Sequence, residues 1–454
     1  MFTNLVQPSR VALKAFRCSF LDFVEDPFYV SESESVRYIA DGMLVLENGK
    51  VKELGTYESL QYKYVEIPVT SYPGMLIMPG FVDTHIHFPQ VEMIASYGEQ
   101  LLEWLNHYTF PTEGKFKDKA YAQEIASIFF DELLKNGTTT ALVFAAVYPQ
   151  SVDAFFEEAS RRNLRMIAGK VMMDRNAPDF LLDTPETSYQ QSKQLIQKWH
   201  KKERLLYAVT PRFAITSTDE QLREAGKLLS EFPDVYLHTH LSENVDEVEL
   251  VASLFPDSKG YLDVYDRAGL VGDKSVFAHC VQLTDVEFKR LSEANSAIAF
   301  CPTSNLFLGS GLFKLELAKS VEYPIKVGLG TDVGAGTSFS LLQTANEAYK
   351  VVQLQRQKLS PFKALFLATL GGARALSLED EIGNFNVGKE ADFIVLDMKA
   401  TPLMALRNRT STATSLDELA LKTFTLMMLG DDRAVRATYI AGELAYEQRL
   451  ARIK

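Results

Sequence analysis

Eight short apolar segments between residues 81 and 334 constrain the fold more than any other feature of this sequence. They are rich in β-branched residues, and most intervals between them carry apolar residues at helical spacing. The segments span residues 81–87, 138–146, 165–174, 205–213, 235–243, 275–280, 296–305 and 326–334. Strands that alternate with helices pair in parallel through right-handed crossovers, and eight such units can close into a barrel. We therefore expect an α/β fold, a (β/α)8 TIM-type barrel, with an open doubly wound sheet as the alternative.

The two ends of the chain have a different pattern. Residues 43–55, MLVLENGKVKELG, alternate around Asn48-Gly49, which is a strong signal for a β-hairpin. Residues 386–398 and 436–447 have the same strand-and-turn character, the second with a turn at Ala441-Gly442. These segments predict β structure at both ends of the chain.

The length of the chain leaves room for a second domain. The chain has 454 residues, and a single barrel typically uses about 250 of them. We expect the barrel to occupy residues 79–380. We expect a small β-sandwich domain to combine residues 1–78 with residues 381–454.

Composition narrows the class of protein. The 47 Lys and Arg residues against 59 Asp and Glu residues give a formal net charge of −12, which argues against binding the phosphates of nucleic acid. No stretch approaches the ~18 consecutive apolar residues of a membrane span, and residues 1–10 lack the features of a secretory signal. Three scattered cysteines, Cys18, Cys280 and Cys301, fit buried thiols in a reducing compartment. We expect a cytoplasmic protein without a nucleic-acid or membrane partner.

Four of the seven histidines fall where a barrel keeps its active site. His85, His87, His240 and His279 lie at the C-terminal ends of the first, fifth and sixth predicted strands. His85 and His87 are two residues apart, so they point to one face of the strand with Cα atoms about 6.6 Å apart, close enough to share a metal ion. A His-X-His pair is a weak signal by itself, and core or surface histidines are the alternative.

Two carboxylates strengthen the prediction of a metal site. Asp332 lies in the apolar, glycine-rich segment VGLGTDVG at the mouth of the eighth strand, where burial costs several kcal/mol unless the charge meets a cation. Three imidazole ligands and this carboxylate would leave one coordination position of the metal ion open for water. Glu243 follows His240 by three residues and could serve as a proton donor without binding the metal, as a glutamate does in nucleobase deaminases. A solvated loop charge is the alternative for Glu243.

Four motifs together resemble the metal-dependent amidohydrolase superfamily. They are PGFVDTHIHFPQ (79–90), HTHLSE (238–243), FAHC (277–280) and GLGTDVGAG (328–336). Within that superfamily the chain is most similar to the guanine deaminase family, through the first motif and through GEQLLEWLNHYTFPTE (98–113), TPRFA (210–214) and FCPTSNLFLGSG (300–311). The resemblance implies a distorted (β/α)8 barrel with a β-sandwich made by both termini.

The resemblance also implies a ligand set. One zinc ion per chain would be held by His85, His87, His240 and Asp332. His279 would hydrogen-bond the attacking water, although some relatives are drawn with this histidine as a further ligand. Binuclear relatives use a carboxylated lysine on strand four, whereas the lysine at a strand end here is Lys170, on the third predicted strand, so one metal is expected.

The reaction implied is the hydrolytic deamination of guanine to xanthine and ammonia, a step of purine catabolism, by a homodimer. Asp332 would accept a proton from water, Glu243 would protonate N3 of the purine, and His279 would support the new oxygen. The groups expected to contact guanine are Gln90, Arg212 and Phe213 together with His87, His240, Glu243 and Asp332. Without the resemblance, Arg212 could equally be a surface ion pair and Phe213 a core residue.

Three other functions remain open at this point. The chain could be another deaminase or hydrolase of the superfamily, acting on cytosine, adenosine-type or chlorotriazine substrates. It could hydrolyse a cyclic amide with two metals, or it could be a non-catalytic scaffold.

Residues 98–113 follow the first strand, where a barrel can carry a lid. We expect Leu101, Leu102 and Leu105 to pack in the core and only the end of the segment to reach the pocket. The remaining histidines, His107, His200 and His238, are expected to be structural.

Overall fold

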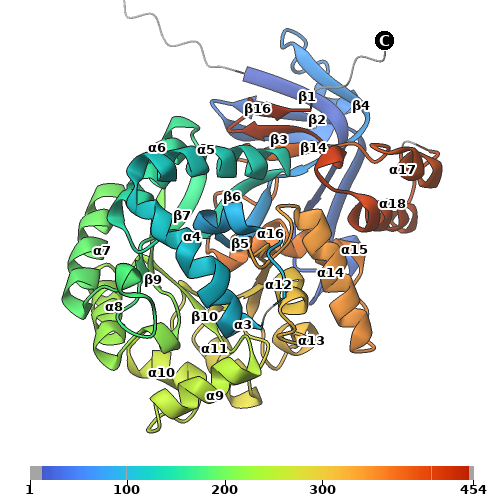
Figure 1. Ribbon diagram of the computed structural model, residues 1–454. Coiled ribbons are helices and arrows are strands. Elements are labelled where there is room, and N and C mark those ends of the chain that lie inside the picture. Colours follow the sequence, from blue (N-terminus) through green and yellow to red (C-terminus); the bar gives the residue numbers. More distant parts are fainter. Residues whose placement is uncertain (1–12, 99, 411, 449–454) are drawn as a thin grey trace, which may run out of the picture.

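The computed structural model describes residues 13–98, 100–410 and 412–448, and it contains a parallel barrel with a separate sheet beside it (Figure 1). The barrel strands pair in the order β13-β12-β11-β10-β9-β7-β6-β5, and the short β8 pairs with β9. Their bounds are β5 Phe81–His87, β6 Thr138–Phe144, β7 Arg165–Gly169, β8 Val171–Met172, β9 Leu206–Pro211, β10 Tyr236–Leu241, β11 Ser275–His279, β12 Ala297–Phe300 and β13 Lys326–Leu329. The amide of Asp332 donates to the carbonyl of His85 at 2.9 Å, which joins the last strand to the first. The structure confirms the predicted barrel and excludes the alternative, an open doubly wound sheet.

Each of the eight predicted segments contains a barrel strand, and three of them differ in detail. The segment 326–334 is strand only as far as Leu329. The segment 165–174 is divided into β7 and β8, with Lys170 between them. The segment 296–305 is strand only as far as Phe300, because Pro302 starts the helix α12, Pro302–Phe307. Proline is favoured in the first turn of a helix, where its missing N–H costs no hydrogen bond.

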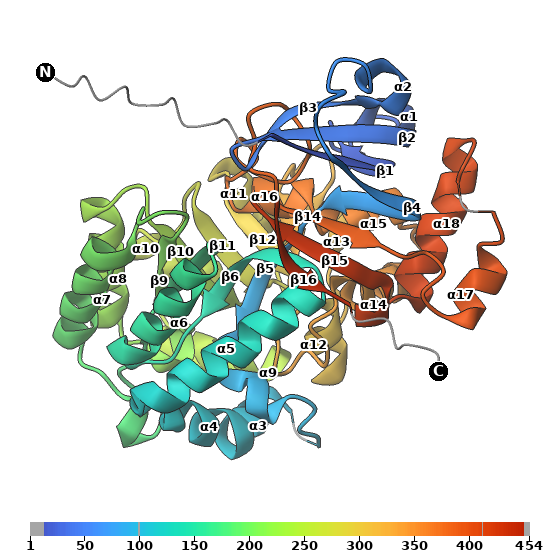
Figure 2. The same ribbon diagram turned by 90° about the horizontal axis from the view of Figure 1, so that it is seen from above.

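Helices surround the barrel in both views (Figures 1 and 2). They are α5 Lys119–Lys135, α6 Pro149–Arg161, α7 Pro185–Trp199, α8 Asp219–Glu231, α9 Val245–Leu254, α10 Tyr261–Arg267, α11 Asp285–Glu293, α12, α13 Leu315–Ala318, α14 Leu341–Leu354, α15 Pro361–Leu367 and α16 Leu370–Ala375. The helical spacing predicted for α5 is confirmed, since Ile125, Phe129 and Leu133 are buried and the helix ends at Asn136-Gly137, where Gly137 has φ +81°.

The terminal segments form one seven-stranded sheet in the order β16-β15-β14-β4-β1-β2-β3, as predicted for a β domain made from both ends of the chain (Figure 2). Its strands are β1 Leu13–Phe23, β2 Val36–Glu47, β3 Lys50–Thr56, β4 Val69–Pro79, β14 Phe393–Leu396, β15 Val435–Ile440 and β16 Glu443–Glu447. Hairpins turn at Asn48-Gly49 and Ala441-Gly442, as expected, whereas residues 386–392 lie outside β14. Short helices α1 Glu32–Ser35 and α2 Tyr57–Leu60 and the pair α17 Pro402–Arg407 and α18 Leu416–Leu429 complete this part.

The region that follows β5 crosses one end of the barrel (Figures 1 and 2). It consists of a 3₁₀ turn at Phe88–Met93, α3 Leu101–Trp104, a π-helical turn at Leu105–Thr109 and α4 Phe110–Gly114. Residues 1–10, on which the expectation about a secretory signal rests, lie outside the described residues. Within the described ranges, no helix has the length and apolar character needed to cross a membrane.

Gly169 at the end of β7 supplies a test of the barrel packing. A Cβ at this position would lie 1.7 Å from the backbone carbonyl oxygen of Ala208 on β9, and neither strand can move aside without breaking its pairing. We expect Gly169→Ala to lower the free energy of unfolding by about 3 kcal/mol, measured by chemical and thermal denaturation. Gly272→Ala is the matched control because its nearest contact would be Ser275 Oγ at 4.0 Å. Equal stability of the two variants would contradict the packing described for β7 and β9.

Candidate active site

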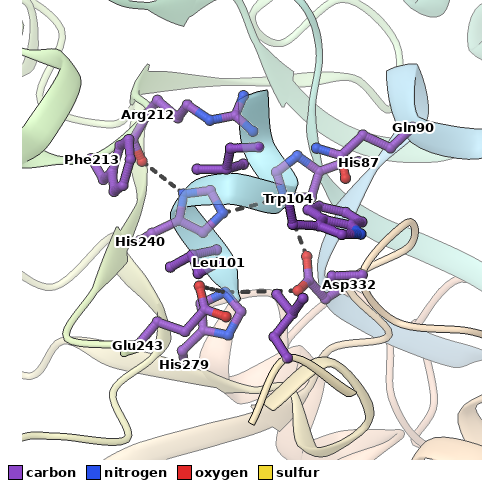
Figure 3. Close-up of a pocket in the computed structure, with 13 residues that line it drawn as sticks. His87, Gln90, Leu101, Trp104, Arg212, Phe213, His240, Glu243, His279 and Asp332 are labelled. Atoms are coloured by element: carbon purple, nitrogen blue, oxygen red, sulfur yellow. Dashed lines mark hydrogen bonds and ion pairs between the residues drawn. The ribbon is translucent and has the colours of Figure 1, made fainter. Parts of the chain in front are cut away.

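A cavity of about 370 Å³ opens at the carboxyl ends of the barrel strands (Figure 3). Its wall combines apolar side chains with titratable ones, namely His87, Gln90, Leu101, Trp104, Leu105, Arg212, Phe213, His240, Glu243, His279, Leu308, Asp332 and Ala335. The site is therefore suited to a small, flat and partly polar ligand.

Four side chains converge on one point of the cavity floor. The donor atoms of His85, His87, His240 and Asp332 all lie within 4.8 Å of one another, and all four residues are buried. His87 Nε2 lies 3.2 Å from His85 Nε2 and 3.2 Å from His240 Nε2. Asp332 Oδ1 lies 3.0 Å from His85 Nε2 and 3.2 Å from His87 Nε2. The edge of a tetrahedron with bonds of 2.0–2.1 Å measures about 3.4 Å, so these four donor pairs have separations that fit ligands of one metal ion.

The outer nitrogens of two imidazoles are held by the protein, which turns their Nε2 atoms inward. His240 Nδ1 lies 2.7 Å from the carbonyl oxygen of Arg212, to which it donates. His85 Nδ1 lies 2.7 Å from His238 Nε2, so His238, expected to be structural, braces His85 from behind. Such outer contacts select the tautomer whose lone pair faces the metal.

Burial keeps these imidazoles neutral. It lowers the pKa of His85, lowers the pKa of His87 to about 3, and holds the pKa of His240 well below its usual value. Neutral imidazoles whose Nε2 lone pairs face one another at 3.2 Å repel, and a cation between them removes the repulsion. The donor set therefore fits a divalent metal ion bound by nitrogen and oxygen.

Asp332 carries a negative charge and has an unusual backbone conformation. Burial opposes its ionisation, but His85, His87 and His279 hold the pKa of Asp332 well below the ordinary value, so the group is a carboxylate at neutral pH. Asp332 has φ +52° and His279 has φ +71°, in the left-handed region that non-glycine residues rarely adopt. Such backbone costs about 1–3 kcal/mol per residue and is concentrated at functional sites. The fold holds both side chains at the cavity despite this cost.

Glu243 lies just past β10, on the cavity wall. Its side chain is 4 % exposed, and Oε1 accepts a hydrogen bond from Ser310 Oγ at 3.2 Å. Burial, with the Asp332 carboxylate nearby, raises the pKa of Glu243 to about 8, so the group carries a proton at neutral pH. Glu247 accepts from the amides of Glu243 and Asn244 at 2.7 and 3.1 Å and thereby fixes this loop. The capping pattern from Asn244 to Glu247 is visible in the sequence and could have indicated this support.

His279 is oriented by a residue that the sequence interpretation missed. Its Nδ1 lies 2.8 Å from Oδ1 of Asn305, which lies in α12. His279 Nε2 is buried, has no hydrogen-bond partner among the described residues, and lies 3.5 Å from Glu243 Oε2 and 3.8 Å from Asp332 Oδ2. An amide oxygen only accepts, so Nδ1 carries a proton and donates it to Asn305, which leaves Nε2 facing the cavity.

Gln90, Arg212 and Phe213 all line the cavity, and Figure 3 shows Arg212 and Gln90 on the side opposite Glu243 and His279. Arg212 is 2 % exposed, which excludes the surface ion pair considered for it. Arg212 forms a buried ion pair with Glu113, another residue that the sequence interpretation missed. Glu113 was within the quoted segment 98–113, but a single glutamate in a helical stretch has no pattern that predicts burial.

The lid segment differs from the expectation. Leu101 and Leu105 were expected only to pack in the core, but both line the cavity together with Trp104. The tail of the segment contributes through Glu113, behind the wall. The indole Nε1 of Trp104 donates to the carbonyl oxygen of Ser96 at 3.1 Å, which holds its ring in place. The short helices after β5 thus close one side of the pocket.

Lys170 does not reach the cavity. It is fully buried between β7 and β8, and its Nζ donates to Asp183 and, at 3.2 Å, to the carbonyl oxygen of Val171. The described cavity wall contains no lysine. This arrangement supplies no bridging group for a second metal.

Comparisons with known proteins agree with this architecture. Residues 76–445 match the Amidohydrolase family. The chain is 57% identical over 440 residues to guanine deaminase of Escherichia coli strain K12, covering 96% of this chain and 98% of that protein. The solved structure of E. coli guanine deaminase superposes with a TM-score of 0.92 at 57% identity, covering 96% of this chain and 100% of that one. Guanine deaminase from C. acetobutylicum, solved with bound guanine in the active site, has a TM-score of 0.86 at 30% identity, with coverage of 96% and 100%. The chain therefore belongs to the amidohydrolase family and, within it, to the guanine deaminases.

Proposed function

We propose that the chain catalyses the zinc-dependent hydrolysis of guanine to xanthine and ammonia. The observation that carries this proposal is one cavity with two opposed walls. One wall holds Glu243 and His279, the opposite wall holds Arg212 and Gln90, and the donor group of three imidazoles and Asp332 lies at the floor between them (Figure 3). Water activation and proton transfer can therefore occur on one edge of a purine while the opposite edge is bound.

In this proposal His85, His87, His240 and Asp332 hold one zinc ion, and His279 lies outside the ligand set. Zinc bound there would lower the pKa of a ligated water to about 7, which makes hydroxide available at neutral pH. Two observations support a single metal. The four donors form one compact group, and Lys170 is paired with Asp183 away from the cavity.

Different side chains at the donor group and next to it carry out the separate proton transfers of the reaction. Asp332, a carboxylate at neutral pH, accepts the proton that the attacking water releases. Glu243, protonated through burial, donates a proton to N3 while hydroxide adds to C2 of guanine. His279 accepts a hydrogen bond through Nε2 from the attacking water and orients it. Asp332 then passes the proton that it took from water to the exocyclic amine, and the C2–N bond breaks to release ammonia. The new hydroxyl on C2 returns its proton to Glu243 and becomes the carbonyl of xanthine.

The opposite wall selects the purine. The Arg212 guanidinium donates to O6 of guanine, an acceptor that adenine lacks, and Gln90 donates and accepts along the ring edge. Phe213 is 4 % exposed and adds an apolar wall. His87, His240, Glu243 and Asp332 complete the contacts with guanine on the reactive side.

The proposal extends to features that rest on the family resemblance. We propose a cytoplasmic homodimer that acts in purine catabolism and salvage. We also propose domain boundaries at residues 1–78, 79–380 and 381–454, supported by the change from the terminal sheet to the barrel between Pro79 and Phe81. Light scattering of the purified protein tests the dimer.

Ammonia release from three nucleobases tests the reaction. We expect purified, zinc-loaded protein to release ammonia from guanine but not from adenine or cytosine, and a chelator to abolish the release. Readdition of zinc should restore it. A zinc-containing sample that releases no ammonia from guanine would contradict the proposed substrate, and release unaffected by complete metal removal would contradict the proposed chemistry.

A further inference from the structure

Glu113 determines how the Gln90 amide is oriented. Gln90 Nε2 donates to Glu113 Oε1 at 3.1 Å, while Gln90 Oε1 accepts from the backbone amide of Gly334 at 3.2 Å. A carboxylate only accepts hydrogen bonds and a backbone N–H only donates, so the two neighbours allow one orientation of the amide. One N–H and one oxygen lone pair of Gln90 then remain for a ligand.

The same carboxylate holds Arg212. Arg212 Nη1 donates to both oxygens of Glu113, each at 2.9 Å, and the side chains are 2 % and 0 % exposed. The described residues offer no acceptor to Nη2 or Nε, while the guanidinium carbon lies 5.6 Å from the centre of the Phe110 ring. A buried guanidinium without a counter-charge would strongly destabilise the folded protein. Glu113 therefore offsets the charge through one nitrogen and leaves the other donors for an acceptor in the cavity.

Glu113 itself stands behind the wall. It is absent from the cavity lining and lies in α4, at the end of the segment whose Leu101, Trp104 and Leu105 do face the cavity. Gln90 comes from the turn after β5 and Arg212 from the end of β9, which lie far apart in the sequence. One buried carboxylate thus joins two side chains from separate strands to the lid segment.

We propose that Glu113 is a positioning residue for substrate selection, which acts through Arg212 and Gln90 to place the donors that recognise O6 of the purine. This inference rests on the proposed function, because it assumes that Arg212 and Gln90 contact guanine. Glu113 takes no part in the chemical step, so its loss should weaken recognition of O6 more than it slows turnover.

Two purines that cannot be deaminated at C2 isolate this recognition. Hypoxanthine carries O6 without the 2-amino group, and purine lacks both, so the ratio of their dissociation constants reports binding of O6 without chemistry. Calorimetry with the zinc-loaded protein measures both constants. We expect the wild type to bind hypoxanthine more tightly, and Glu113→Gln to weaken hypoxanthine binding by about 10-fold while purine binding changes less than about 3-fold. For guanine, KM should rise more than kcat falls.

Three further variants make the test specific. Glu113→Asp keeps the charge opposite Arg212 but withdraws the carboxylate by one methylene, so it should fold even if Glu113→Gln does not, and it should still reduce the ratio. In the Arg212→Ala background, Glu113→Gln should change the ratio little, because the two residues act together. Glu103→Gln on α3 is the matched control, since Glu103 is exposed on the same lid segment. Zinc content should equal that of the wild type in every variant.

The outcomes separate the inference from the proposed function. A wild type that binds both purines equally and leaves guanine intact would contradict the function. A wild type that deaminates guanine and prefers hypoxanthine, with the same preference in Glu113→Gln and Glu113→Asp, would overturn the positioning role alone. Additive losses in the double variant would also overturn it, because Glu113 would then act independently of Arg212.

Discussion

Replacement of Glu243 by Gln is expected to lower kcat for guanine by about 10²–10⁴-fold while the metal content per chain equals that of the wild type. Glutamine has nearly the same shape and can still accept from Ser310 Oγ, which lies 3.2 Å from Oε1 in the wild type. It cannot donate the acidic proton that burial retains on Glu243, whose pKa is raised to about 8. Ammonia release and metal analysis on the same preparation measure the two quantities.

The control for this variant is Glu249→Gln on α9, where the glutamate is exposed and distant from the cavity lining. Its kcat should match that of the wild type. Turnover near the wild-type rate in fully metallated Glu243→Gln would remove Glu243 from the mechanism. Loss of zinc from that variant would instead make Glu243 part of the metal site.

Asp332→Asn is expected to reduce kcat by about 10³-fold or more and to weaken zinc retention. The carboxylate lies 3.0 and 3.2 Å from the Nε2 atoms of His85 and His87, and it is the only anionic member of the four-residue donor group. The neutral amide removes both the charge that balances the cation and the proton acceptor, a combined loss of several kcal/mol in the transition state. Dialysis followed by metal analysis, with activity measured across zinc concentrations, checks both effects.

Activity that remains low at saturating zinc would agree with two roles for Asp332, ligand and proton acceptor. Recovery of the wild-type rate at saturating zinc would leave only the ligand role. Asp273→Asn is a suitable control because Asp273 is exposed and pairs with Lys326, the first residue of β13, at the opposite end of the barrel. That variant should keep both zinc and activity.

Much of the fold can be predicted from the local spacing of apolar residues. The alternation of apolar segments and helical stretches predicts the barrel because strand and helix periodicities differ and both are visible within about ten residues. The segments in which the predicted strands differ from the structure have physical explanations as well. Segment 296–305 is strand only as far as Phe300, because Pro302 lacks an N–H donor and starts a helix. Residues 386–392, NVGKEAD, contain a single β-branched residue beside a glycine and three charged residues, and only Phe393–Leu396 finds partners on both sides, β4 and β15.

The supporting residues of the site could not be predicted in the same way. His238 and Asn305 differ little from other polar residues in their segments, and their importance comes from contacts with His85 and His279. These pairs are separated by 153 and 26 residues, so they meet only when the strands close into the barrel. The role of Leu101 and Leu105 could not be predicted from sequence either. An apolar helix face has the same residue pattern whether it packs in a core or lines a cavity.

The sequence by itself determined the class of fold and the chemical groups of the site, because strand ends in a parallel barrel share one face and their side-chain types can be counted in advance. The tertiary structure decided which donor atoms converge, how Asn305 orients His279, and how Arg212 is neutralised. Those features depend on distances of about 3 Å between residues from different strands, such as Arg212 and Glu113 at 2.9 Å. Local sequence carries no information at that scale, since burial and partner geometry arise only when the barrel and its lid segment pack together.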